Sequence, residues 1–163
     1  MSARVLAVEP LTRSAFARFG DVIEPANAQK VYPINEGTAT RYHDLARIDC
    51  GNAGGRAVLS LFRAQPRPLP FDVTMLERHP LGSQAFVPQG AFPYLVVVGT
   101  GADHPPRAFL ANNGQGVNFH AGTWHHPLLA LGRESDFLVI DRAGPGENCD
   151  EVRLAETWRI EPL

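Results

Sequence analysis

The sequence predicts an all-β fold that closes as a sandwich or a small barrel. Fifteen glycines and fourteen prolines punctuate the 163 residues, and most apolar runs between them are short. Short apolar runs bounded by turn residues are typical of strands. The chain has no repeat of fixed period, no low-complexity tract and no linker. We therefore expect residues 1–163 to form a single domain.

One short helix is expected near the N-terminus. Thr12 can cap it, Phe16 and Phe19 give it an apolar face, and Gly20 can end it.

Strand signals dominate the rest of the chain. They cover residues 57–62, 75–79, 84–87, 94–98, 108–111, 117–120 and 137–140. The run 94–98 is continuously apolar, which predicts a strand buried on both faces. Residues 80–82 form a turn, and residues 112–114 (Asn-Asn-Gly) predict a hairpin between the strands that flank them. Residues 152–160 fit either a strand or a short terminal helix.

Charge and composition exclude several classes of partner. The formal net charge is −2, only Lys30 is a lysine, and the arginines are scattered, which argues against nucleic-acid binding. No stretch is apolar enough for a signal peptide or a membrane span, so we expect a cytoplasmic protein without a membrane partner. In that reducing compartment Cys50 and Cys149 are expected to be free thiols.

Three of the six histidines, His120, His125 and His126, fall within seven residues of a glycine-bearing segment. Imidazole is the commonest side-chain metal ligand and titrates near neutral pH. Upstream, Glu77 and His79 would project to the same face of a strand. Such a pair is short and common, so a surface glutamate and histidine beside a turn is an equally good interpretation.

The two segments resemble the two conserved motifs of cupins. Residues 120–126 resemble PxGxxH, with His120 in the place of the proline and His125 as the final histidine. Residues 77–84 resemble HxH followed by a glutamate, with Glu77 replacing the first histidine and Gln84 the glutamate. This resemblance implies a cupin-type double-stranded β-helix, or jelly-roll barrel. It also implies a divalent metal held by Glu77, His79, Gln84 and His125. These donors suit nickel, iron, manganese or zinc; without a metal they would form an acid–base and hydrogen-bonding pocket.

The match is closer to one family, the ureidoglycolate lyases. It rests on INEGTATRYHDL (34–45), RAQP (63–66), ERHPLGSQAFVP (77–88) and GQGVNFHAGTWHHPL (114–128), followed by DFLVIDR (136–142) and NCD (148–150). The resemblance implies cleavage of (S)-ureidoglycolate to glyoxylate and urea during allantoin and purine breakdown. It also implies a homodimer and favours nickel, although whether a metal is required stays open.

That chemistry suggests roles for further residues. The substrate carries a carboxylate, which Arg41 or Arg63 could hold through paired hydrogen bonds. His120 and His126 compete with each other for the acid–base role. Two other interpretations stay open: another metal-dependent cupin enzyme acting on a small hydroxy acid, and a non-catalytic cupin that binds a small ligand.

Overall fold

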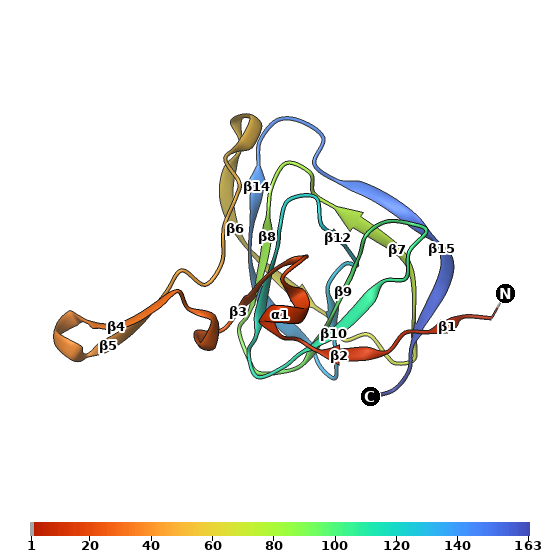
Figure 1. The fold of residues 1–163 in the computed structure, drawn as a ribbon, viewed down its shortest axis with the longest axis horizontal. Helices are drawn as coiled ribbons and strands as arrows, with labels where there is room; N and C mark the ends of the chain where they lie inside the picture. The colour runs from red at the N-terminus through yellow and green to blue at the C-terminus, as the bar shows by residue number, and fades with distance from the viewer. Residues whose placement is uncertain (1) are drawn as a thin grey trace.

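The computed structural model describes residues 2–163 and confirms the all-β prediction. Figure 1 shows strands curled around a common interior, with one short helix beside them. The larger sheet, sheet A, contains, in spatial order, β1 (Arg4–Val5), β15 (Asp150–Ile160), β7 (Phe71–Arg78), β12 (Trp124–His125), β9 (Tyr94–Gly99), β10 (Arg107–Ala111) and β2 (Val8–Pro10), with β13 (Leu129–Ala130) also paired to β9. Sheet B contains, in order, β3 (Gly20–Ile23), β11 (Gly116–Phe119), β8 (Gln84–Pro88), β14 (Ser135–Ala143) and β6 (Arg56–Ala64).

The chain alternates between the two sheets. From β6 in sheet B it crosses to sheet A for β7 and returns to sheet B for β8. Strands β9 and β10 follow in sheet A, β11 in sheet B, β12 and β13 in sheet A, β14 in sheet B and β15 in sheet A. This winding of antiparallel strands is a double-stranded β-helix of the cupin type, as the resemblance implied.

The main core lies between the sheets and is built from alternate residues of their strands. From sheet A it takes Tyr94, Val96 and Val98, and from sheet B Phe86 and Phe137 are among its members. A second cluster covers the other face of sheet A and includes the intervening residues of β9. Every residue of β9 is therefore buried, which confirms the expectation drawn from its continuous apolar run.

The N-terminal helix is present but brief. Helix α1 (Arg13–Phe16) begins at Thr12, whose Oγ1 accepts a hydrogen bond from the Ala15 N–H at 3.3 Å, as the capping pattern predicts. Phe16 is fully buried in the core, while Phe19 lies beyond the end of the helix and joins the same core. Residues 152–160 belong to β15, so the strand alternative holds for that segment.

The predicted hairpin at residues 112–114 is wrong. The chain does turn there, with positive φ angles at Asn113 (53°) and Gly114 (80°). However, β10 pairs with β9 and β2, whereas β11 pairs with β3 and β8. The turn carries the chain from sheet A to sheet B, because a turn sequence specifies a reversal of direction and leaves the pairing partner to the rest of the fold.

A third sheet stands apart from the barrel. It has two strands, β4 (Lys30–Ile34) and β5 (Ala39–His43), which pair only with each other. Residues 30–43, the arm, project away from the barrel on the side where β3 and β6 are seen in Figure 1. Three short 3₁₀ turns complete the structure: η1 (Pro25–Asn27), η2 (Asn35–Gly37) at the tip of the arm, and η3 (Asn52–Gly54).

Both cysteines are free, Cys50 buried and Cys149 exposed. Within residues 2–163, no helix has the length and apolar character needed to cross a membrane.

Candidate metal centre

Two strands of sheet A and the turn after one of them bring Glu77, His79 and His125 together. Strand β12 lies between β7 and β9, and in this register His125 is directly opposite Glu77. His79 follows the last residue of β7. One ligand atom from each of the three lies within 4.8 Å of the other two. The structure thus gathers three of the four side chains that the cupin resemblance nominated as metal ligands.

Hydrogen bonds fix which nitrogen of each imidazole faces the cluster. Nδ1 of His79 donates to the carbonyl oxygen of Asn148 at 2.8 Å, and Nδ1 of His125 donates to the carbonyl oxygen of His126 at 3.2 Å. A nitrogen that donates to a carbonyl carries the proton in a neutral imidazole, which leaves the lone pair on Nε2. Both Nε2 atoms are buried and have no hydrogen-bond partner.

Burial shifts the ionisation of the cluster. His125 is 2% exposed, and burial, opposed only in part by its bond to the His126 carbonyl, lowers its pKa to about 3. Its imidazole is therefore neutral at physiological pH and available as a ligand. Burial also raises the pKa of Glu77, and the nearby His79 opposes that rise. Glu77 Oε1 is 3.9 Å from His79 Nε2, too far for a hydrogen bond.

These observations fit a divalent cation. Two imidazole lone pairs and one half-buried carboxylate converge without a proton donor between them, an arrangement that is unfavourable unless a positive charge joins it. The hydrogen bonds from Nδ1 of each histidine to a backbone carbonyl are the orienting contacts commonly found behind metal-binding histidines. Imidazole and carboxylate donors suit nickel, zinc, manganese and iron alike, so the donor set does not choose among them.

Sheet B supplies the wall facing His125. The Phe119 ring lies parallel to the His125 imidazole, with centroids 4.1 Å apart and an interplanar angle of 4°. Gln84 is the register partner of Phe119. Its Nε2 donates to Asp141 Oδ2 at 3.2 Å, while its buried Oε1 has no partner. The fourth nominated residue is thus the strand neighbour of the ring that stacks on His125, and its side-chain oxygen is unused.

His120 does not join the cluster. Strand β11 ends at Phe119, and Gly122 turns the chain with a φ of 80°. His120 is the first residue after Phe119, and its Nε2 lies 3.3 Å from Asp21 Oδ2 in an exposed position.

His126 is also separated from the cluster. Its ring packs edge-to-face against Phe71 at the first residue of β7, whereas Glu77 is near the last residue of that strand. Nδ1 of His126 donates to the Pro127 carbonyl at 2.8 Å, and burial lowers the pKa of the imidazole.

Neither nominated arginine reaches the cluster. Arg63 is paired with Asp136 through two hydrogen bonds of 2.9 and 3.0 Å and is largely exposed. Arg41 lies on the arm, where its guanidinium stacks on Tyr32. Arg63 lies on the same face of β6 as Leu59 and Leu61, and that face points outward, because the two leucines are 66% and 52% exposed.

Sequence reasoning assigned no role to several residues that support the site. Asn148 holds His79 through its backbone carbonyl and accepts the Leu81 N–H on Oδ1 at 2.8 Å. Cys149 and Glu151 form a second group with Glu77, in which the ligand atoms are again within 4.8 Å of one another. The NCD segment containing Asn148 and Cys149 was the signal in the sequence, but its contacts lie about seventy residues away and no local pattern reveals them.

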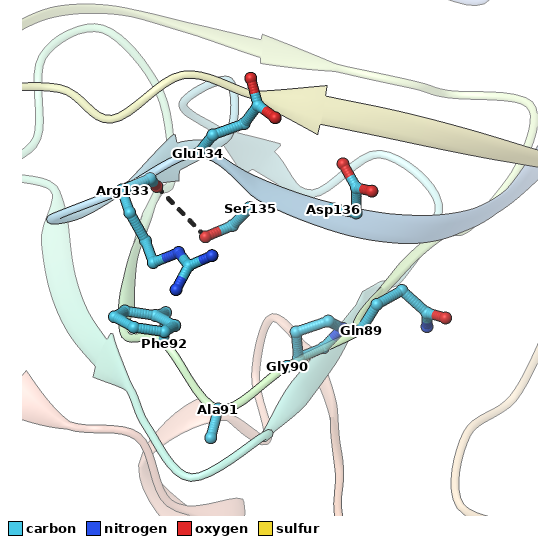
Figure 2. Close-up of a pocket in the computed structure, with 9 residues that line it drawn as sticks. Gln89, Gly90, Ala91, Phe92, Arg133, Glu134, Ser135 and Asp136 are labelled. Carbon is cyan, nitrogen blue, oxygen red and sulfur yellow. Dashed lines mark hydrogen bonds between the residues drawn. The ribbon is translucent and has the colours of Figure 1, made fainter.

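A separate cleft of about 350 Å³ lies between the loops around Pro88 and Glu134. Figure 2 shows Arg133 beside the Phe92 ring in this cleft, and the guanidinium is 4.5 Å from the ring centroid. The cleft adjoins the Pro88 end of β8, whereas the metal cluster adjoins the Gln84 end. It is therefore a different part of the surface.

Comparisons with known proteins agree with the sequence resemblance. The model of the family described as Ureidoglycolate lyase matches residues 3–161. A ureidoglycolate lyase of Burkholderia mallei (strain NCTC 10229) is 57% identical over 157 residues, covering 94% of this chain and 92% of the relative. One of Burkholderia cepacia is 53% identical over 161 residues, covering 96% and 90%. Among solved structures, a 3,4-ketoisomerase from Helicobacter canadensis aligns with a TM-score of 0.47 and 13% identity, covering 77% of this chain and 84% of that one.

Proposed function

Because this chain belongs to the ureidoglycolate lyase family, we propose that it cleaves (S)-ureidoglycolate into glyoxylate and urea. The structural observation that supports this proposal is the pair of unpartnered imidazole Nε2 atoms beside Glu77. The reaction needs a site that binds adjacent carboxylate and hydroxyl oxygens, and a cation held by these donors would provide one.

The bond changes define what the residues must do. The substrate hydroxyl loses its proton and becomes the carbonyl of glyoxylate, the bond from the same carbon to the urea nitrogen breaks, and that nitrogen takes up a proton as urea leaves. Glu77, His79 and His125, with Gln84 as a fourth donor, would hold a divalent cation, which we propose to be nickel. When bound, it would supply a Lewis acid for the substrate oxygens.

Proton transfer is assigned to the remaining histidines. His126 has a pKa lowered by burial and is neutral, so it is the candidate acceptor of the hydroxyl proton. His120, whose partner is Asp21, is the candidate donor to the leaving nitrogen.

For the substrate carboxylate we favour Arg41 over Arg63, because Asp136 already occupies the Arg63 guanidinium. We also include in the proposal a homodimer, a single domain over residues 1–163, a cytoplasmic location and a place in purine breakdown.

The test is turnover of racemic ureidoglycolate by the purified protein, with glyoxylate and urea measured separately. We expect both products at equal rates, with activity lost after chelation and restored by added nickel. His125→Ala should lose both metal content and turnover, whereas His104→Ala, on an exposed loop, should keep both. If neither product exceeds the spontaneous rate, with or without divalent metal, the lyase assignment fails. Ammonia and carbon dioxide in place of urea would indicate an amidohydrolase.

A further inference from the structure

The arm is a two-stranded sheet with no third strand or helix to support it. Its strands pair over five residues each, from Lys30↔His43 to Ile34↔Ala39, and neither strand pairs with sheet A or B. Figure 1 shows it extending away from the barrel. An isolated hairpin is at best marginally stable in water, and it is usually stabilised by packing against another surface.

One face of the arm is apolar and exposed. Val31 is paired with Tyr42, and Pro33 with Thr40, so these four side chains share one face. Val31 is 56% exposed and Tyr42 45% exposed. The charged residues Lys30 and Arg41 belong to the other face. The arm is thus amphipathic, with its charged residues on one face and the exposed Val31 and Tyr42 on the other.

The outer face of sheet B is apolar as well. Leu59 and Leu61 on β6 are paired with Ile140 and Leu138 on β14, and the four share a face. The buried Phe137 and Val139 alternate with the β14 pair and fill the core, which identifies the leucine face as the outer one. An antiparallel sheet whose other face meets water normally carries polar residues there. We call these four residues the sheet B patch.

We propose that the arm of one protein molecule packs its Val31–Tyr42 face on the sheet B patch of a second copy, and that the two copies exchange arms reciprocally. The same chain carries both unpartnered apolar surfaces, and the arm projects on the side of the barrel where sheet B lies. When the contacts are exchanged about a twofold axis, the arm face and the sheet B patch of both copies are buried. No such surface is then left free, so the assembly closes at two copies.

The charges around the two surfaces agree with this partner. Neither the Val31–Tyr42 face nor the sheet B patch contains a charged side chain, and Arg63, at the end of the patch, is already neutralised by Asp136. An apolar surface of matching character is therefore the expected occupant, rather than a nucleic acid or a strongly charged chain. The proposal refines the homodimer included in the proposed function, and its readout is mass rather than turnover, so the two can fail separately.

The experiment measures molecular mass in solution by sedimentation equilibrium on the full chain. We expect the wild-type protein to have twice the 17.8 kDa of one chain at micromolar concentration. Val31→Asp on the arm and Leu59→Lys on the patch should each weaken dimerisation by roughly 100-fold or more, because each buries an unpaired charge. Val5→Asp is the matched control: Val5 is 67% exposed, but it lies in β1 on the far side of the barrel, and the dimer should persist.

Mixing the two variants gives the decisive measurement. A dimer of one Val31→Asp chain and one Leu59→Lys chain has one unaltered arm on an unaltered patch, and in the other contact an aspartate faces a lysine. The mixture should therefore form dimers although neither variant does alone, which also demonstrates that both variants are folded. A monomeric wild-type protein, or a dimer that persists in both single variants, would overturn the proposal. So would a mixture that remains monomeric.

Discussion

Replacing His125 with phenylalanine isolates the effect of its ionisation on stability. The site suits this substitution because the imidazole already lies flat on the Phe119 ring at 4.1 Å, in a place that is 2% exposed. A phenyl ring keeps the aromatic stack and fills a similar volume, but it cannot take up a proton.

The magnitude follows from the pKa of His125. In the folded protein burial holds it at about 3, against 6.5 for the exposed side chain. Between these values the unfolded chain binds the proton and the folded protein does not, so stability is full above pH 6.5 and falls as the pH drops toward 3. Each pH unit in this window lowers the free energy of unfolding by about 1.4 kcal/mol. Lowering the pH from 6.5 to 4.5 should therefore lower it by on the order of 2–3 kcal/mol.

The assay is urea unfolding of the metal-free protein at pH 7 and pH 4.5, for the wild type and for His125→Phe. Glu77 acts in the opposite direction, because its raised pKa favours the folded state as the pH falls, but it is present in both proteins and cancels in the comparison. The wild type should lose about 2–3 kcal/mol more than the variant. Equal losses in the two proteins would refute the assignment of a buried, neutral His125.

Three further predictions concern single contacts. Gly20→Ala should destabilise the fold by roughly 3 kcal/mol or more in thermal or urea unfolding, because a β-carbon there would collide with the backbone of β11, whereas Gly51→Ala meets open space and should change little. Asn148→Ala removes the acceptor for the Leu81 N–H and should weaken metal binding about 10- to 100-fold by titration, with the fold intact; unchanged affinity would contradict this. Tyr94→Phe leaves the Gln115 carbonyl without its donor and should cost about 1–2 kcal/mol in the same unfolding assays; no change would argue against that bond.

Local sequence patterns predicted the elements well because the information needed for each element is local. The apolar run of β9 reports burial on both faces, and Thr12 reports the start of α1 through a bond that spans three residues. The hairpin at residues 112–114 failed for the same reason. The sequence correctly predicted a turn at these residues, but whether β10 and β11 pair with each other depends on strands elsewhere in the chain.

The candidate site divides in a similar way. The alternation of Glu77 and His79 and the motif position of His125 nominated three side chains that the structure brings together, because each lies on or next to a regular strand. His120 follows the end of β11 and precedes the turn at Gly122, where strand alternation no longer specifies direction. The stack on Phe119 and the bond to Asn148 depend on tertiary contacts that no single segment encodes.

The Phe119 stack also determines how the site can adapt. With a phenyl ring covering one face and a carbonyl bond holding Nδ1, the His125 imidazole cannot tilt or swing, and Nε2 has one fixed direction. His79 is restrained by its own carbonyl bond. Glu77 has no such restraint, and its carboxylate can bind through one oxygen or both. Ions of different radius should therefore be accommodated by movement of the Glu77 carboxylate alone, while the two imidazole Nε2 atoms keep a fixed separation.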